Sequence, residues 1–129
     1  MLVIDATVAL AAAGADNGLD YFEDELVAPP LMWSESRSVL HELARRGEID
    51  PEDAVTTRRR LERSRIRRQA PAKLGAEAWD IANQLGWAKT CDAEYVALAG
   101  LLGCRLVTLD ARLRRGAARL GYVIGPDEL

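Results

Sequence analysis

Short apolar runs alternate with amphipathic segments along this chain, and the alternation predicts the order of its elements. Runs such as Leu2-Val3-Ile4 are typical of buried parallel strands, and helical spacing of apolar residues before a glycine is typical of helices. The pattern predicts strands over 2–5, 26–28, 105–109 and 122–124, with an extended segment over 64–68. It predicts helices over 7–13, 18–24, 31–46, 51–63, 74–85, 92–102 and 111–120. We therefore expect an α/β fold in three α/β/α layers, with helices on both faces of a central parallel sheet.

The length and composition favour a single domain over residues 1–129. The chain is 49% apolar, enough for a real core, and it contains no repeat or low-complexity run. We expect no secretory leader and no membrane span, since no apolar stretch is long enough to span a bilayer. Cys91 and Cys104 are too few, and wrongly spaced, for a zinc site or a disulfide framework. We expect both thiols to be reduced and buried in a cytoplasmic protein.

Four acidic residues far apart in the chain each follow a predicted strand or open a predicted helix. Because parallel strands end at one edge of a sheet, where α/β folds place their sites, these acids can converge there. Crowded carboxylates repel and raise one another's pKa, and a hard divalent cation such as Mg2+ relieves that repulsion. The pattern predicts a metal site for phosphodiester chemistry, formed by Asp5, Glu35, Asp92 and Asp110.

Each of these acids has a simpler explanation beside the catalytic one. Asp5, Asp92 and Asp110 all stand where a helix cap is favoured, and a cap and a metal ligand can occupy the same place. Glu35 lies inside a helix, which has Leu31, Val39 and Leu43 as its expected core residues. Glu42 and Glu94 are expected to lie outside the site.

Two threonines flank the acids. Thr7 and Thr108 are each two residues from an Asp, where a hydroxyl can orient a carboxylate or a water; helix capping for Thr7 and β-propensity for Thr108 are the alternatives. His41 is the only histidine and is expected to be structural. A Cys91 nucleophile is disfavoured, because neighbouring carboxylates raise a thiol pKa. We therefore expect a metal-activated water as the nucleophile.

Four segments together resemble the PIN-domain nucleases, and among them the VapC toxins of type II toxin–antitoxin pairs. The third segment is the most specific match, and all four occur in the family's order over nearly the whole chain. The segments are Val3-Ile4-Asp5-Ala6-Thr7-Val8, Pro30-Leu31-Met32-Trp33-Ser34-Glu35, Thr90-Cys91-Asp92-Ala93-Glu94-Tyr95-Val96-Ala97-Leu98-Ala99 and Leu106-Val107-Thr108-Leu109-Asp110.

The resemblance implies a Mg2+- or Mn2+-dependent endoribonuclease with a PIN-like fold that cleaves structured RNA, such as transfer or ribosomal RNA. It also implies a homodimer and a cognate VapB-like antitoxin whose tail fills the acidic groove. Asp5 and Asp92 would hold the metal, and Asp110 would complete its shell or bridge to a second ion. Glu35 would orient the attacking water or take its proton.

Net charge of -3 argues against binding of nucleic acid over the whole surface, but the arginines are unevenly distributed. Seven fall within residues 58–68, which we call the arginine segment: Arg58, Arg59, Arg60, Arg63, Arg65, Arg67 and Arg68. This segment can contact RNA, an acidic antitoxin or only solvent. We single out Arg59 and Arg63 from it, and Arg112 and Arg115 beside Asp110, as candidate contacts with RNA or antitoxin.

Three other classes share parts of the pattern. A haloacid-dehalogenase-type phosphatase needs a second Asp where this chain has Thr7, and a Lys for which Lys89 is a poor match. A receiver domain needs an early pair of acids that is missing. A catalytically weak PIN-like module that binds RNA or a partner remains the alternative to the nuclease, ranked lower because all four acids are present.

Overall fold

The computed structural model describes residues 1–129, and its strands form one five-stranded sheet in the order β3-β2-β1-β4-β5. All neighbouring strands are parallel, and Val3 of β1 lies opposite Val27 of β2 and Leu106 of β4. The strand order reverses beside β1, so the carboxyl edge has a topological switch point between β1 and β4. The strands are β1 (Leu2–Ile4), β2 (Leu26–Ala28), β3 (Arg67–Arg68), β4 (Arg105–Val107) and β5 (Val123–Ile124).

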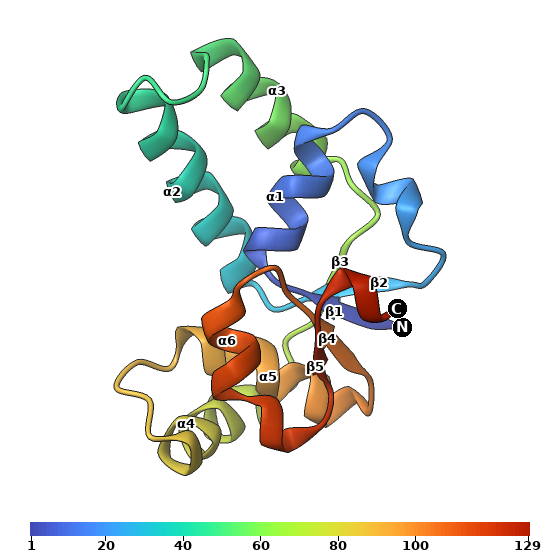
Figure 1. Cartoon of the computed structure of the whole chain (residues 1–129), viewed down its shortest axis with the longest axis vertical. Helices are drawn as coiled ribbons and strands as arrows, with labels where there is room; N and C mark the ends of the chain where they lie inside the picture. The colour runs from blue at the N-terminus through green and yellow to red at the C-terminus, as the bar shows by residue number, and fades with distance from the viewer.

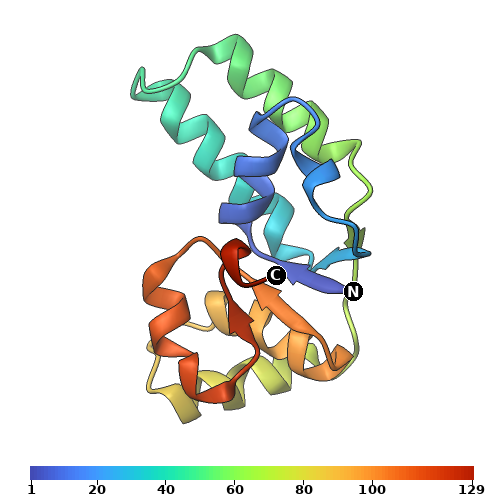
Figure 2. The same ribbon diagram turned by 45° about the vertical axis from the view of Figure 1, so that its right-hand side comes forward.

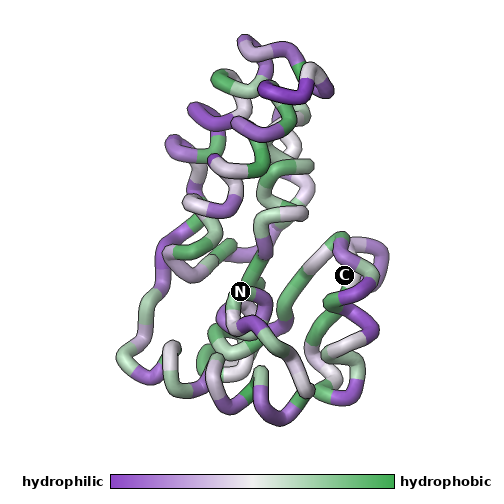
Figure 3. The backbone as a smooth tube through the Cα atoms, turned by 90° about the vertical axis from the view of Figure 1, so that its left-hand side faces the viewer, coloured by the Kyte–Doolittle hydropathy of each residue, from purple (hydrophilic) through white to green (hydrophobic).

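Helices cover both faces of this sheet (Figure 1, Figure 2). One group, α1, α2 and α3, packs on one side, and α4 and α5 pack against each other on the opposite side. The α2–α3 hairpin extends away from the sheet, and hydrophilic residues gather at its tip (Figure 3). The helices are α1 (Ala6–Gly14), α2 (Leu31–Arg45), α3 (Pro51–Glu62), α4 (Leu74–Leu85), α5 (Cys91–Leu102) and α6 (Ala111–Gly116). The predicted three-layer α/β/α class with a parallel sheet is confirmed.

The core lies between the two helical layers and includes the central strands. All residues of β1 and β2 are buried, as expected for continuous apolar runs between two covered faces. Helix α5 is apolar nearly all round its circumference, and its residues from Tyr95 to Ala99 are all buried. This burial holds the start of α5 against β1 and β4, near the switch point.

Several boundaries differ from the prediction for local reasons. The segment expected as a helix over 18–24 is a 3-10 turn over Gly18–Tyr21, and the strand expected over 105–109 ends at Val107. The helix expected over 111–120 stops at Gly116, a poor helix former, and continues as a 3-10 turn over Ala118–Leu120. The end of β4 at Val107 leaves Thr108 and Asp110 in a loop.

Two expectations about burial are wrong. Helix α2 buries Met32, Trp33, Ser36 and Leu40, whereas Val39 is 38% exposed; the core-facing stripe is rotated because both α1 and α3 pack against this helix. The thiol of Cys91 is exposed, since it opens α5 at the sheet edge, and that of Cys104 is half-buried. None of the helices is long and apolar enough to cross a membrane.

Candidate active site

Asp5 is the most constrained of the four acids. It follows β1 and is the N-cap of α1, where its Oδ1 accepts hydrogen bonds from the Val8 amide at 3.1 Å and the Thr7 hydroxyl at 2.5 Å. Its Oδ2 accepts a hydrogen bond from the hydroxyl of Thr108. The residue is 4% exposed. Both of its oxygens are therefore held, and the cap and the predicted ligand share one position.

The two threonines connect Asp5 to the loop that carries Asp110. Besides donating to Asp5, Thr108 Oγ1 accepts a hydrogen bond from the Asp110 amide at 3.0 Å. Thr7 Oγ1 likewise accepts one from the Leu109 amide at 3.0 Å. Each hydroxyl thus bridges segments about a hundred residues apart. This geometry fits the predicted orienting role of Thr7 and Thr108, which stays a prediction about function.

Asp110 and Asp92 come from the starts of two other helices. Asp110 is the N-cap of α6, and its Oδ1 accepts hydrogen bonds from the amides of Arg112 and Leu113 at 2.9 and 3.3 Å. Asp92 is not a cap: Thr90 occupies that position of α5, and Asp92 lies within the first turn. Its carboxylate accepts no hydrogen bond from the chain, so both oxygens are available to a ligand.

Glu35 reaches the site from α2, on the other side of the sheet from α5 (Figure 1). Its Oε1 accepts a hydrogen bond from the Tyr95 hydroxyl, and its Oε2 has no partner within the chain. Glu42 lies two helical turns after Glu35 and forms a surface ion pair with Arg46, in agreement with the expectation that it lies outside the site. Glu94 is likewise expected to lie outside the site, yet its charge is close enough to raise the pKa of Glu35.

Burial and mutual repulsion raise the pKa of three of the acids. The pKa of Asp5 is raised mainly by burial and further by Asp110, although its hydrogen bonds oppose the shift. The pKa of Asp92 is raised most by desolvation and next by the charge of Asp110, while Arg112 lowers it. The pKa of Glu35 is raised mainly by burial, and the hydrogen bond from Tyr95 lowers it. The charges of three nearby acids raise it further: Asp92, Asp5 and Glu94. The four acids therefore form one electrostatic cluster, which we call the acidic site.

The donor set of the acidic site fits a hard divalent cation. The oxygens without a partner in the chain are carboxylate oxygens of Asp92, Asp110 and Glu35, which Mg2+ and Mn2+ prefer. No three such side chains stand close enough to form a ready-made coordination shell. Repelling carboxylates separate when no cation neutralises them, and Mg2+ completes its shell with water rather than requiring a full protein cage.

The arginine segment does not form one basic patch. Arg60 pairs with Asp16 and Arg67 with Glu25, while Arg58 lies beside Glu62. Arg68 stacks over the ring of Trp33, 4.8 Å from its centroid. These four are therefore engaged within the chain.

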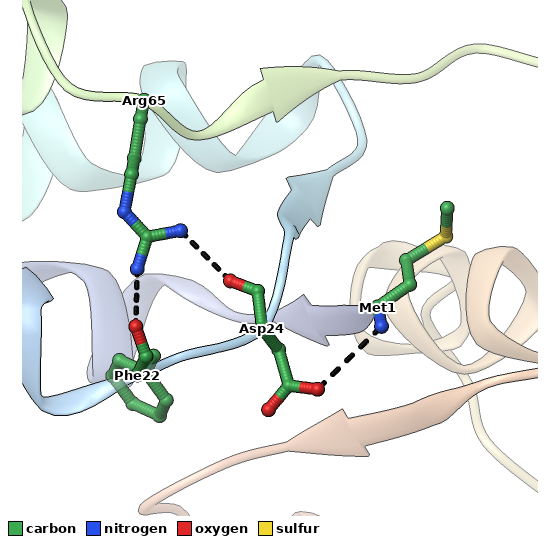
Figure 4. A network of polar contacts seen from close by, with 4 residues as sticks. All are labelled: Met1, Phe22, Asp24 and Arg65. Carbon is green, nitrogen blue, oxygen red and sulfur yellow. Dashed lines mark hydrogen bonds and ion pairs between the residues drawn. The ribbon is translucent and has the colours of Figure 1, made fainter.

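Arg65 makes more hydrogen bonds than any other arginine of the segment. It donates to the carbonyl oxygens of Leu19, Phe22 and Asp24, two of which are drawn in Figure 4. The side chain of Asp24 also lies 3.6 Å from the amino group of Met1. Arg65 therefore fastens the connection between α3 and β3 to the segment that precedes β2.

The four candidate RNA or antitoxin contacts are exposed, and their side chains have no ion pair within the chain. Arg59 and Arg63 lie on and just after α3, and Arg112 and Arg115 lie on α6. Arg112 is near enough to Asp92 to lower its pKa. Of the four, Arg112 is thus the one that the structure brings to the acidic site.

Tyr95 was missed as a site residue. It is 1% exposed, and burial together with the carboxylate of Glu35 raises its pKa, which keeps the phenol protonated and able to donate. A signal for it exists in the sequence: Tyr95 is three residues after Asp92, on the same helix face, and a buried tyrosine hydroxyl requires a partner.

The fold is a small parallel sheet with four acids at its carboxyl edge. A family model described as the PIN domain matches residues 2–118. The chain belongs to the PIN-domain family, and its predicted PIN-like fold is confirmed.

Relatives with known names narrow this class. The chain is 39% identical over 118 residues to "Ribonuclease VapC9" of Mycobacterium tuberculosis and to "VapC ribonuclease Mb0985" of Mycobacterium bovis, covering 88% of each chain. The predicted kinship with VapC ribonucleases is confirmed.

Solved structures show the same fold. PAE2754 from Pyrobaculum aerophilum superposes with a TM-score of 0.75 at 22% identity, over 98% of this chain and 84% of that one. Mycobacterium tuberculosis VapC20, described as a "Sarcin-Ricin loop cleaving toxin", superposes with a TM-score of 0.66 at 17% identity, over 95% and 97% of the two chains. At these identities the likeness concerns the fold alone.

Proposed function

We propose that this protein is a toxic, divalent-metal-dependent endoribonuclease that cleaves structured RNA and is neutralised by a cognate antitoxin. The observation that carries the proposal is the convergence of Asp5, Glu35, Asp92 and Asp110 from four separate segments at the switch point. The raised pKa values of Asp5, Glu35 and Asp92, and the unpartnered oxygens of Glu35, Asp92 and Asp110, fit a cation better than a fully paired structural network. The named VapC ribonucleases among the relatives support the ribonuclease activity.

The residues of the chain divide the work of phosphodiester hydrolysis. Asp5, Asp92 and Asp110 would hold the metal, which when bound polarises a phosphoryl oxygen and lowers the pKa of water. Thr7 and Thr108 fix the carboxylate of Asp5 in one orientation, so that it does not have to reorganise during the reaction. The free Oε2 of Glu35 orients the attacking water or accepts its proton.

Positive charge must bring a polyanion to an acidic site. Arg112 and Arg115 on α6 are the nearest candidates for contacts with RNA phosphates, and Arg59 and Arg63 on α3 are further ones. Structured RNA is the proposed substrate class, with ribosomal or transfer RNA foremost, since one structural neighbour is described as cleaving the sarcin-ricin loop. We propose a VapB-like antitoxin and a homodimer as the assembly partners.

Cleavage of total RNA by the purified protein tests this function. The reaction is run with Mg2+, with Mn2+ and with EDTA, beside Asp92→Asn and the control Asp80→Asn. Asp80 is an exposed acid on α4, outside the acidic site. We expect discrete fragments with either metal, none with EDTA or Asp92→Asn, and wild-type fragments with Asp80→Asn.

Two results would contradict the proposal. Cleavage that persists in EDTA would exclude the metal-dependent mechanism. Failure of antitoxin-free protein to cut any RNA with either metal would favour the alternative, a PIN-like module that binds RNA or a partner without cleaving.

A further inference from the structure

One hydrogen bond joins the two helical layers at the acidic site. Tyr95 is part of α5 and Glu35 is part of α2, which pack on opposite sides of the sheet (Figure 1). The Tyr95 hydroxyl donates to Oε1 of Glu35, although the two residues are 60 positions apart in the chain. The contact thus crosses the carboxyl edge of the sheet beside the metal-ligand candidates.

Tyr95 is a firm support for such a contact. Its side chain is 1% exposed and lies in the hydrophobic core together with Val96 and Leu98 of the same helix. A buried ring has few rotamers and cannot follow a moving partner. By contrast, Glu35 has three side-chain torsions and is only half-buried, so without the hydroxyl its carboxylate can adopt other rotamers or turn to solvent.

The spacing in α5 couples this support to a second acid. Asp92 and Tyr95 are three residues apart and share one helix face, so α5 presents a carboxylate and a phenol to the same edge. The hydroxyl occupies Oε1 of Glu35 and leaves Oε2 free. A displacement of α5 relative to α2 would therefore change the position of Glu35 relative to Asp92.

We infer that Tyr95 is a positioning residue. Its hydroxyl holds Glu35 so that the free oxygen of that carboxylate points toward the water that attacks RNA. This inference rests on the proposed nuclease function, and it adds to the four acids a neutral residue that touches neither metal nor substrate. Because a misplacement of about 1 Å can cost a hundredfold in rate, we expect Tyr95→Phe to lower kcat between about tenfold and a hundredfold. KM should stay within about twofold, because the phenol is too deeply buried to contact RNA.

A double-mutant cycle separates positioning from a general structural role. Single-turnover cleavage rates are measured for the wild type, Tyr95→Phe, Glu35→Ala and the double variant. If the hydroxyl acts through Glu35, Tyr95→Phe changes the rate of Glu35→Ala by less than about twofold. Tyr122→Phe is the matched control, since its hydroxyl donates at 3.4 Å to the Val96 carbonyl and to none of the four acids of the acidic site; we expect its kcat and KM to equal those of the wild type.

The outcomes separate the inference from the proposed function. A Tyr95→Phe defect that persists in full in Glu35→Ala, a defect confined to KM, or an unchanged kcat would each overturn the inference while leaving the nuclease intact. If the wild type cleaves no RNA, the function fails, and the same cycle on urea unfolding decides whether the hydroxyl holds Glu35. Absence of coupling there would also overturn the inference.

Discussion

The acidic site and the arginine segment are opposite cases of how charges are arranged in this protein. The four acids are scattered over more than a hundred residues, yet they meet at the edge between β1 and β4, where burial and neighbouring acids raise the pKa of Asp5, Glu35 and Asp92. The seven arginines lie within eleven positions, yet five of them contact different partners: Asp16, Glu25, Glu62, a tryptophan ring and three carbonyl oxygens. The other two, Arg59 and Arg63, have no ion pair within the chain. Proximity in sequence is therefore a poor guide to which charges act together.

The difference has consequences for how each region tolerates change. Charges in the acidic site share hydrogen bonds and repel one another, so a change at one should alter the others. Charges in the arginine segment act in separate places, so their effects should be independent and differ in kind: structural for Arg65, and on RNA affinity for Arg59 and Arg63.

The largest expected effect comes from the hydroxyl that links Asp5 to Asp110. Thr108→Val keeps the volume but removes the donor to Asp5 and the acceptor of the Asp110 amide at a residue that is 0% exposed. We expect the rate of RNA cleavage to fall between about tenfold and a hundredfold, because the carboxylate of Asp5 loses its orientation.

Two further variants serve as references for Thr108→Val. Thr7→Val should have a smaller effect, since Thr7 is exposed and water can replace its hydroxyl. Thr56→Val, on the surface of α3, should have none. Equal cleavage rates for Thr108→Val and Thr56→Val would show that the network does not support the site.

Within the arginine segment, a substitution at Arg65 should lower the stability of the fold rather than the rate of RNA cleavage. Arg65→Ala removes three hydrogen bonds to carbonyl oxygens, and a net loss of about 1–2 kcal/mol in unfolding free energy is expected. Cleavage per folded molecule should remain unchanged. The loss of stability is measured by urea unfolding of Arg65→Ala beside Arg63→Ala, whose side chain has no partner. Equal unfolding midpoints for the two variants would argue against a stabilising role of the three Arg65 hydrogen bonds.

RNA affinity should show a weaker and graded response. In a Glu35→Gln background that prevents cleavage, Arg112→Gln is expected to weaken binding about tenfold and Arg59→Gln about threefold, because Arg112 is nearer to the acidic site. Each true phosphate contact should reduce the slope of log affinity against log salt by about one. An unaltered slope in both variants would mean that these arginines face only solvent or a protein partner.

The smallest expected effect concerns stability against pH. The pKa values of Asp5, Glu35 and Asp92 are raised in the folded state, so the folded protein binds more protons than the unfolded chain just above the ordinary carboxyl pKa of about 4. These bound protons stabilise the folded protein fully at pH values below the ordinary carboxyl pKa. The stabilisation is lost as the pH rises through the raised pKa values. The acidic site therefore destabilises the metal-free protein at neutral pH.

Removal of one charge should relieve part of this cost. Asp92→Asn is expected to raise the thermal midpoint by about 1–3 °C at about pH 7, and the gain should vanish near pH 3, where the acids are protonated. Added MgCl2 should narrow the difference, because a bound cation stabilises only the wild-type site. A lower midpoint for Asp92→Asn at neutral pH would refute the repulsion among the acids.

The sequence by itself determined the order of the elements and the four acids at their ends. Continuous apolar runs form β1 and β2, a proline and an acid start α3, and glycines follow α4 and α5, because these are local preferences of a few neighbouring residues. The acids could be recognised because a strand end or helix start is itself a local feature. Their meeting at one edge followed from the expected parallel sheet.

Only the tertiary structure decided which side chains meet. The bond from Tyr95 to Glu35, the exposure of Val39 and the separate partners of five arginines in the arginine segment depend on which layers pack together and on the strand order β3-β2-β1-β4-β5. Local backbone preference contains no record of these contacts, since their residues lie tens of positions apart. Burial and Coulomb interaction act through space, so the chemistry of the acidic site arises only when the sheet is assembled.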